Sequence, residues 1–98
     1  MQVNIQSVKF DATEQLQQFI NKKVAKLEKV CGDIISIDVT LSITKRETVN
    51  NKEAKIIVNV PKKQILVGKI CDTFEKAVAS AVESAEVQLI KYKQKLAE

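Results

Sequence analysis

The sequence contains no histidine and no tryptophan, and only two glycines and one proline among 98 residues. Without histidine the chain lacks the side chain that most often acts as a general base and that commonly completes a zinc site. The two glycines stand alone, which excludes a glycine-rich phosphate loop. No serine or cysteine lies in a recognisable nucleophile motif. These absences predict a protein that is not an enzyme and that has no metal, cofactor or small-molecule substrate.

Cysteines and long apolar runs are equally scarce. Cys31 and Cys71 are too few for a metal site, and disulfides are rare inside cells, so we expect two reduced thiols. No apolar run approaches the roughly 20 residues that cross a bilayer. The N-terminal residues MQVNIQSVKF show no signal-peptide pattern. We therefore expect a cytoplasmic protein with no membrane partner, folded as one domain over residues 1–98.

Two segments have the apolar spacing of amphipathic helices, residues 14–31 and 73–96. An Asp-x-x-Glu pattern precedes each helix, beginning at Asp11 and Asp72, although Thr13 is an equally good N-cap. Gly32 follows the first segment, where we expect it to form a left-handed C-terminal cap.

Alternating apolar and polar residues predict strands over residues 2–8, 35–45, 54–60 and 64–70. A polar loop over 46–52 and a short turn at Pro61 join the last three strands, and Gly68 suggests a bulge or close packing. The order β-α-β-β-β-α predicts an α+β fold, a four-stranded sheet with both helices packed on one face. The longest strand should place these side chains under the helices: Ile35, Ile37, Val39, Leu41 and Ile43.

The net charge of +4 is concentrated in lysine stripes on the two predicted helices. Lys22, Lys26 and Lys29 follow one another at i, i+4 and i+7, away from the apolar side, and only one residue four positions away from any of them, Asp33, is acidic. Lys91 and Lys95 extend a second polar stripe. A lysine stripe can be an ordinary solvated helix face, but two such stripes favour a nucleic acid as partner.

Aromatic residues are too few for base stacking. Phe10, Phe19, Phe74 and Tyr92 all have positions in, or at the edge of, the predicted core. We therefore expect contacts with phosphates, whose strength falls as the salt concentration rises, rather than stacking on single-stranded bases.

Three stretches, in this order, carry a family resemblance. They are MQVNIQSVKFDATEQLQQFI at the N-terminus, KKVAKLE at 22–28 followed by IISIDVTLSITK, and DTFEKAV with the tail QLIKYKQKL. Together they resemble the short form of the ribosome hibernation-promoting factor family, also called the ribosome-associated inhibitor A or sigma-54 modulation protein family.

The resemblance implies a double-stranded-RNA-binding-like fold and a single ribosome-binding domain that is a monomer when unbound. It implies binding to small-subunit rRNA in the channel of mRNA and tRNA, which blocks translation sterically in stationary or starved cells. The family pattern matches RNA-facing positions at Lys23, Lys26, Lys91, Lys93 and Lys95, to which the stripe on the first helix adds Lys22 and Lys29.

A second hypothesis is a protein-interaction module of the same fold that has lost or weakened ribosome binding. Ala79, Ser84 and Val87 stand where the family often has Asp, Lys and Arg, so the second helix is less basic in its middle. Val87 and Ile90 also fall outside the apolar face of that helix, where they could contact a partner protein.

Overall fold

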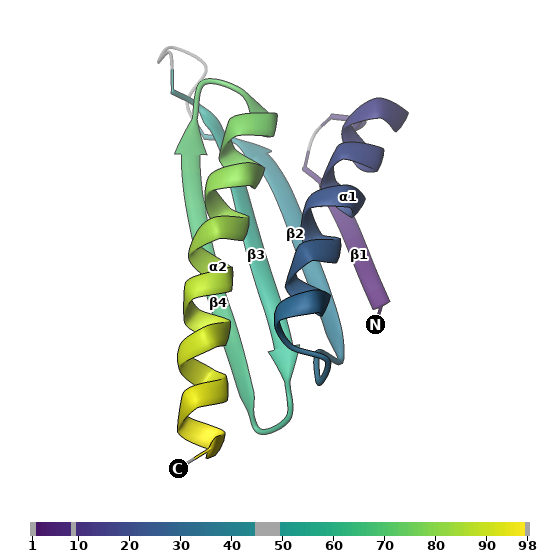
Figure 1. The fold of residues 1–98 in the computed structure, drawn as a ribbon. Helices are drawn as coiled ribbons and strands as arrows, with labels where there is room; N and C mark the ends of the chain where they lie inside the picture. The colour runs from purple at the N-terminus through teal and green to yellow at the C-terminus, as the bar shows by residue number, and fades with distance from the viewer. Residues whose placement is uncertain (1, 9, 45–49, 98) are drawn as a thin grey trace.

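A computed structural model describes residues 2–8, 10–44 and 50–97, and it has the predicted order β-α-β-β-β-α. The four strands form one sheet in the order β1-β2-β3-β4, with β1 parallel to β2 and the other pairs antiparallel. Both helices cover the same face of this sheet (Figure 1). Most of the predicted loop lies outside the described residues. The elements are β1 Gln2–Ser7, α1 Glu14–Val30, β2 Ser36–Ile43, β3 Lys52–Val60, β4 Lys63–Cys71 and α2 Phe74–Ala97.

Threonine starts both helices. The Thr13 hydroxyl accepts a hydrogen bond from the Leu16 amide at 3.1 Å, and the Thr73 hydroxyl accepts one from the Lys76 amide, also at 3.1 Å. Each bond satisfies a backbone donor that has no partner in the first turn. Thr13 is therefore the N-cap of α1, and Thr73, rather than Asp72, occupies the equivalent place before α2.

The end of α1 differs from the prediction. No described glycine has a positive φ, so Gly32 does not form a left-handed cap. The helix ends at Val30, and Cys31 is already extended, with its amide bonded to the Leu27 carbonyl at 3.0 Å. The chain therefore leaves α1 in an extended conformation, which leads it towards β2.

The core lies between the helices and one sheet face. Ile37, Val39 and Leu41 of β2 are at most 1% exposed, as predicted. The prediction was wrong for Ile35 and Ile43, which are 60% and 37% exposed. Ile35 precedes β2 and Ile43 is its last residue, so both lie at the ends of the sheet. Alternation fixes the face on which a side chain lies, but the length of sheet that the helices cover depends on tertiary packing.

The β3–β4 hairpin is regular. Its register runs without interruption from Val60–Lys63 to Lys52–Cys71, so the predicted bulge at Gly68 is absent. A Cβ atom at Gly68 would lie 3.8 Å from Cγ of Lys55, an ordinary contact, so close packing does not require glycine there either. In the turn, Pro61 is followed by Lys62, whose φ is 67°. Proline has a negative φ, and a negative φ followed by a positive φ is typical of a type II turn.

Tyr92 connects α2 to this turn. Its hydroxyl donates a hydrogen bond to the Pro61 carbonyl at 3.1 Å, and its side chain is buried. Burial, and to a smaller extent the nearby Cys31 and Asp33, raise the pKa of Tyr92 above its ordinary value of 10.0. The folded protein therefore binds this proton more tightly than the unfolded chain does.

We expect the stability contributed by Tyr92 to be lost in alkali. It is fully present below the unfolded pKa and falls as the pH rises through the raised folded pKa. Tyr92→Phe has no proton to lose, whereas the lysines titrate in both proteins. The difference in urea midpoint between wild type and Tyr92→Phe should therefore begin to shrink at about pH 10 and become smaller as the pH rises further. A difference that stays constant above this pH would contradict the raised pKa.

Candidate nucleic-acid interface

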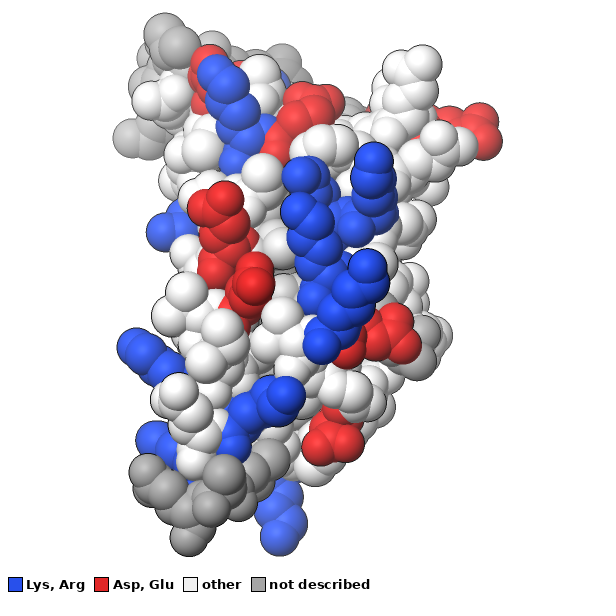
Figure 2. Space-filling model, viewed as in Figure 1, with Lys and Arg blue, Asp and Glu red and all other residues white. Residues whose placement is uncertain are grey.

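The lysine stripe of α1 lies on the outer surface of the helix layer. Lys22, Lys26 and Lys29 are exposed, and within the described residues none of the three forms an ion pair. Figure 2 shows blue side chains gathered over α1. Helical spacing explains the cluster, because residues four and seven apart fall on one side of a helix that buries Ile20, Val24 and Leu27 on another side. These ammonium groups are free to meet an anion.

Lys23 has a different environment from its neighbours. It is half-buried, and its ammonium nitrogen lies 5.5 Å from the centroid of the Phe19 ring. This geometry fits a cation–π contact. The stem of Lys23 packs along the edge of the apolar face while its charge remains near the surface, as expected for a long cationic side chain. Lys23 can therefore support the cationic surface, but it is held more firmly than Lys22 or Lys26.

Lys93 connects the two helices. Its ammonium group donates a hydrogen bond to the Val30 carbonyl at 2.8 Å, across 63 positions of sequence. Val30 is the last residue of α1. At this end of a helix the carbonyl groups lack helical partners and the negative end of the helix dipole is located. Lys93 therefore has a structural role that the sequence did not reveal, and it adds positive charge at the C-terminal end of α1.

Lys91 and Lys95 lie on another flank of α2. Two residues along a helix correspond to a rotation of about 200°, so Lys91 projects almost opposite to Lys93. Since Lys93 reaches α1, Lys91 and Lys95 project on the flank turned away from α1, and both are exposed. The structure thus joins Lys93 to the cluster on α1 and separates Lys91 and Lys95 from it.

Acidic side chains interrupt the basic surface. Glu83 is exposed and Glu86 half-buried on the middle of α2. In Figure 2, red side chains on the middle of α2 lie beside the blue cluster over α1 and above the blue side chains near the C-terminal end of α2. The exposed lysines of the helix face therefore gather on α1, where Glu28 is also exposed, whereas the middle of α2 carries Glu83 and Glu86.

The aromatic residues are engaged within the protein, which confirms their predicted place at the core. The Phe10 and Phe74 rings stack at a centroid distance of 4.9 Å, and Phe19 is half-buried beneath Lys23.

Cys31 is buried and Cys71 half-buried, both as free thiols. In the described ranges we find no group of three or more acidic, cysteine or histidine side chains suited to a metal, and no helix apolar and long enough to span a bilayer.

Residues 3–97 match the protein family described as Sigma 54 modulation protein / S30EA ribosomal protein. The chain belongs to this family. It is also 24% identical over 95 residues to the ribosome hibernation promoting factor of Azotobacter vinelandii, an alignment that covers 97% of this chain and 85% of that relative. The resemblance read from the three sequence stretches is thereby confirmed.

Two solved structures share the fold of this family member. The Thermus thermophilus Protein Y N-terminal domain superposes with a TM-score of 0.81 at 20% identity, covering 94% of this chain and 99% of that chain. A ribosomal subunit interface protein from Coxiella burnetii superposes with a TM-score of 0.86 at 23% identity, covering 96% and 99%. The predicted α+β fold, a sheet with two helices on one face, is confirmed.

Proposed function

We propose that this protein is a ribosome hibernation factor that binds small-subunit rRNA in the channel of mRNA and tRNA and blocks translation sterically. Membership of the Sigma 54 modulation protein / S30EA ribosomal protein family supports association with the ribosome. The observation that supports the rRNA contact is a set of exposed lysines on α1 that form no ion pair with a described residue: Lys22, Lys26 and Lys29.

The mechanism needs no chemistry beyond charge neutralisation and occupancy. Each lysine that reaches a phosphate releases condensed counterions, which favours binding at low salt. A folded body whose Cα extents are 47 × 23 × 18 Å then excludes mRNA and tRNA from the space it fills. In this proposal Lys23 and Lys93 reinforce the α1 surface, and Lys91 and Lys95 contact RNA on the opposite flank of α2. The protein acts as a cytoplasmic monomer, as one domain, and without catalysis.

Co-sedimentation with purified ribosomal subunits tests this function. We expect the protein to sediment with the small subunit at low salt, to be released as the salt concentration rises, and to compete with mRNA and tRNA for binding. Binding to the large subunit alone, or small-subunit binding that leaves mRNA and tRNA in place, would contradict the proposed channel.

An alternative function is a protein-interaction module of the same fold with lost or weakened ribosome binding. Val87 and Ile90 of α2 are 52% and 44% exposed and lie three positions apart, so they present apolar surface on one side of the helix. If the wild-type protein fails to sediment with either subunit at low salt, this module becomes the better description.

A further inference from the structure

The free edge of β4 is a surface that the proposed rRNA contact does not use. Within the described residues β4 pairs only with β3, and no element lies beyond it (Figure 1). Alternate backbone N–H and C=O groups of an edge strand point away from its neighbour and can pair with another strand. With nine residues, β4 offers a long edge for such pairing.

The two faces of β4 differ in chemistry. On the face that the helices leave open, Leu66 and Ile70 are 62% and 49% exposed. On the face covered by α2, Lys63 is exposed and Lys69 half-buried, and neither forms an ion pair with a described residue. These two lysines are the only charged residues of β4. A strand added at this edge would meet apolar side chains on one face and positive charge on the other.

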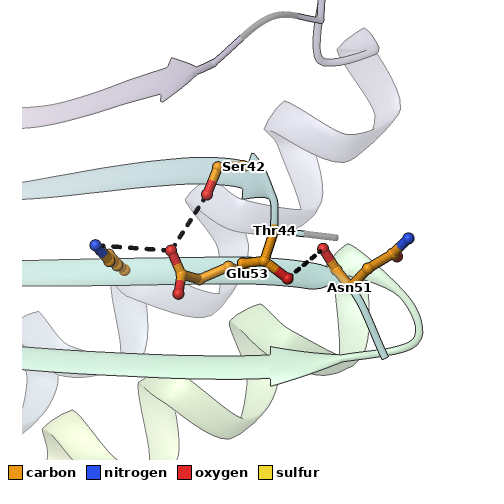
Figure 3. Close-up of polar contacts among 5 residues, drawn as sticks. Ser42, Thr44, Asn51 and Glu53 are labelled. Atoms are coloured by element: carbon orange, nitrogen blue, oxygen red, sulfur yellow. Dashed lines mark hydrogen bonds and ion pairs between the residues drawn. The ribbon is translucent and has the colours of Figure 1, made fainter. Parts of the chain in front are cut away.

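A shallow hollow of about 330 Å³ lies on the open sheet face next to this edge, with Thr40 and Lys55 among its lining residues. It opens beside Gly68, which has no side chain to fill it, and Ile57 and Leu66 form part of its lining. The neighbouring part of the same sheet face is polar instead, since the Glu53 carboxylate accepts a hydrogen bond from the Ser42 hydroxyl at 3.2 Å (Figure 3). Among the residues of the four strands that lie on this open face, the large exposed apolar side chains are Leu66 and Ile70, both on β4.

We propose that the free edge of β4 binds, as a fifth strand, an extended segment of a partner protein in which apolar and acidic residues alternate. Successive side chains of a strand point to opposite faces, so the apolar side chains would lie beside Leu66 and Ile70 while the carboxylates lie beside Lys63 and Lys69. Backbone hydrogen bonds to the edge supply affinity, and the two-faced pattern supplies specificity.

Charge disfavours a second copy of this chain in the register that would bring the exposed Leu66 side chains of the two copies together. Antiparallel pairing of two β4 strands centred on Leu66 would place Lys63 opposite Lys69 of the other copy, and like charges directly opposite destabilise a sheet. RNA is disfavoured as well, because Leu66 and Ile70 offer its phosphates no donor and a nucleic acid has no amide ladder to pair with the edge.

The test uses a blocked synthetic peptide of about seven residues in which glutamate and leucine alternate. It should bind the wild-type protein and shift the backbone amide signals of β4 in an NMR titration. A peptide of the same composition with its glutamates and leucines in separate blocks should bind more weakly, because its side chains no longer match both faces. Equal binding of the two peptides, or shifts confined to the helices, would overturn the proposal.

Substitutions at one position separate docking from diffuse charge attraction. Leu66→Glu should weaken binding of the alternating peptide by about tenfold or more, since it removes apolar contact and adds a like charge. Leu66→Lys should also weaken it despite its added positive charge, whereas diffuse attraction would make this variant bind more tightly. Ile35→Glu is the matched control, because Ile35 is 60% exposed, almost as much as Leu66, but lies outside β4. It should bind as wild type does.

Two further measurements test the alternative occupants of the β4 edge, which are RNA and a second copy of this chain. Leu66→Glu should sediment with ribosomal subunits as wild type does, because the α1 lysines are unchanged. A loss of sedimentation would mean that this edge belongs to the RNA-binding surface, and it would overturn the proposal. A concentration-dependent dimer that Leu66→Glu dissociates would likewise overturn it in favour of self-pairing.

Discussion

Leu41→Ala is expected to lower the free energy of unfolding by about 2–5 kcal/mol, a large part of the stability of a small domain. Leu41 is completely buried at the centre of the sheet, where β2 pairs with both β1 and β3. Truncation removes apolar contacts with the helices and leaves a cavity that a close-packed core closes only in part. Urea denaturation with an unchanged m-value measures this loss directly.

Ile35→Ala is the control for this prediction. Ile35 lies an even number of positions from Leu41 and therefore on the same face of the sheet, but it is 60% exposed at the end of the sheet. Its truncation should therefore lower the free energy of unfolding by only about 0.5 kcal/mol. A loss below about 1 kcal/mol for Leu41→Ala, or an equal loss at the two positions, would show that the helices do not cover the sheet as described.

Lys26→Ala is expected to weaken binding to the small ribosomal subunit and to reduce the salt slope of binding by about one unit. Lys26 is exposed in the middle of the α1 stripe, so folding should change by no more than about 0.5 kcal/mol. Removing Lys22, Lys26 and Lys29 together should reduce the slope by about three units. Co-sedimentation over a series of salt concentrations measures both quantities.

In the proposed function Lys91 contacts RNA on the outer flank of α2, so Lys91→Ala should also reduce the salt slope of binding by about one unit. Lys55→Ala is the matched control. Lys55 lies on the sheet face opposite the helices, with a side chain 63% exposed and within 3.7 Å of Glu53. Equal losses for Lys26→Ala and Lys55→Ala would indicate diffuse charge attraction, and no loss for Lys26→Ala or Lys91→Ala would favour the protein-interaction module.

Lys93→Ala is less suited to that comparison. Its ammonium group holds the Val30 carbonyl at 2.8 Å, so the substitution removes a contact between the helices as well as a positive charge. A weaker RNA affinity of this variant would mix a structural with an electrostatic cause.

Local patterns were enough to predict the elements of this fold and their order. Period-two alternation marked β2 and β3, helical spacing marked α1 and α2, and short turns allowed only adjacent antiparallel pairing of the last three strands. The lysine stripe of α1 was equally visible, because positions on one helix keep their relation whatever surrounds them. These features depend on neighbours in the sequence, and the sequence by itself determined them.

Features that depend on distant parts of the chain needed the tertiary structure. Ile35 and Ile43 share the alternation of the core residues, but only the packed helices decide how much of β2 is covered. Lys93 meets Val30 through the packing of α2 against α1, which also turns Lys91 and Lys95 to the far flank. The edge of β4, with Leu66 on one face and Lys69 on the other, is exposed because β4 is last in the strand order and, among the described residues, pairs only with β3. Sequence patterns set which way a side chain points along its own element, and packing sets what it meets there.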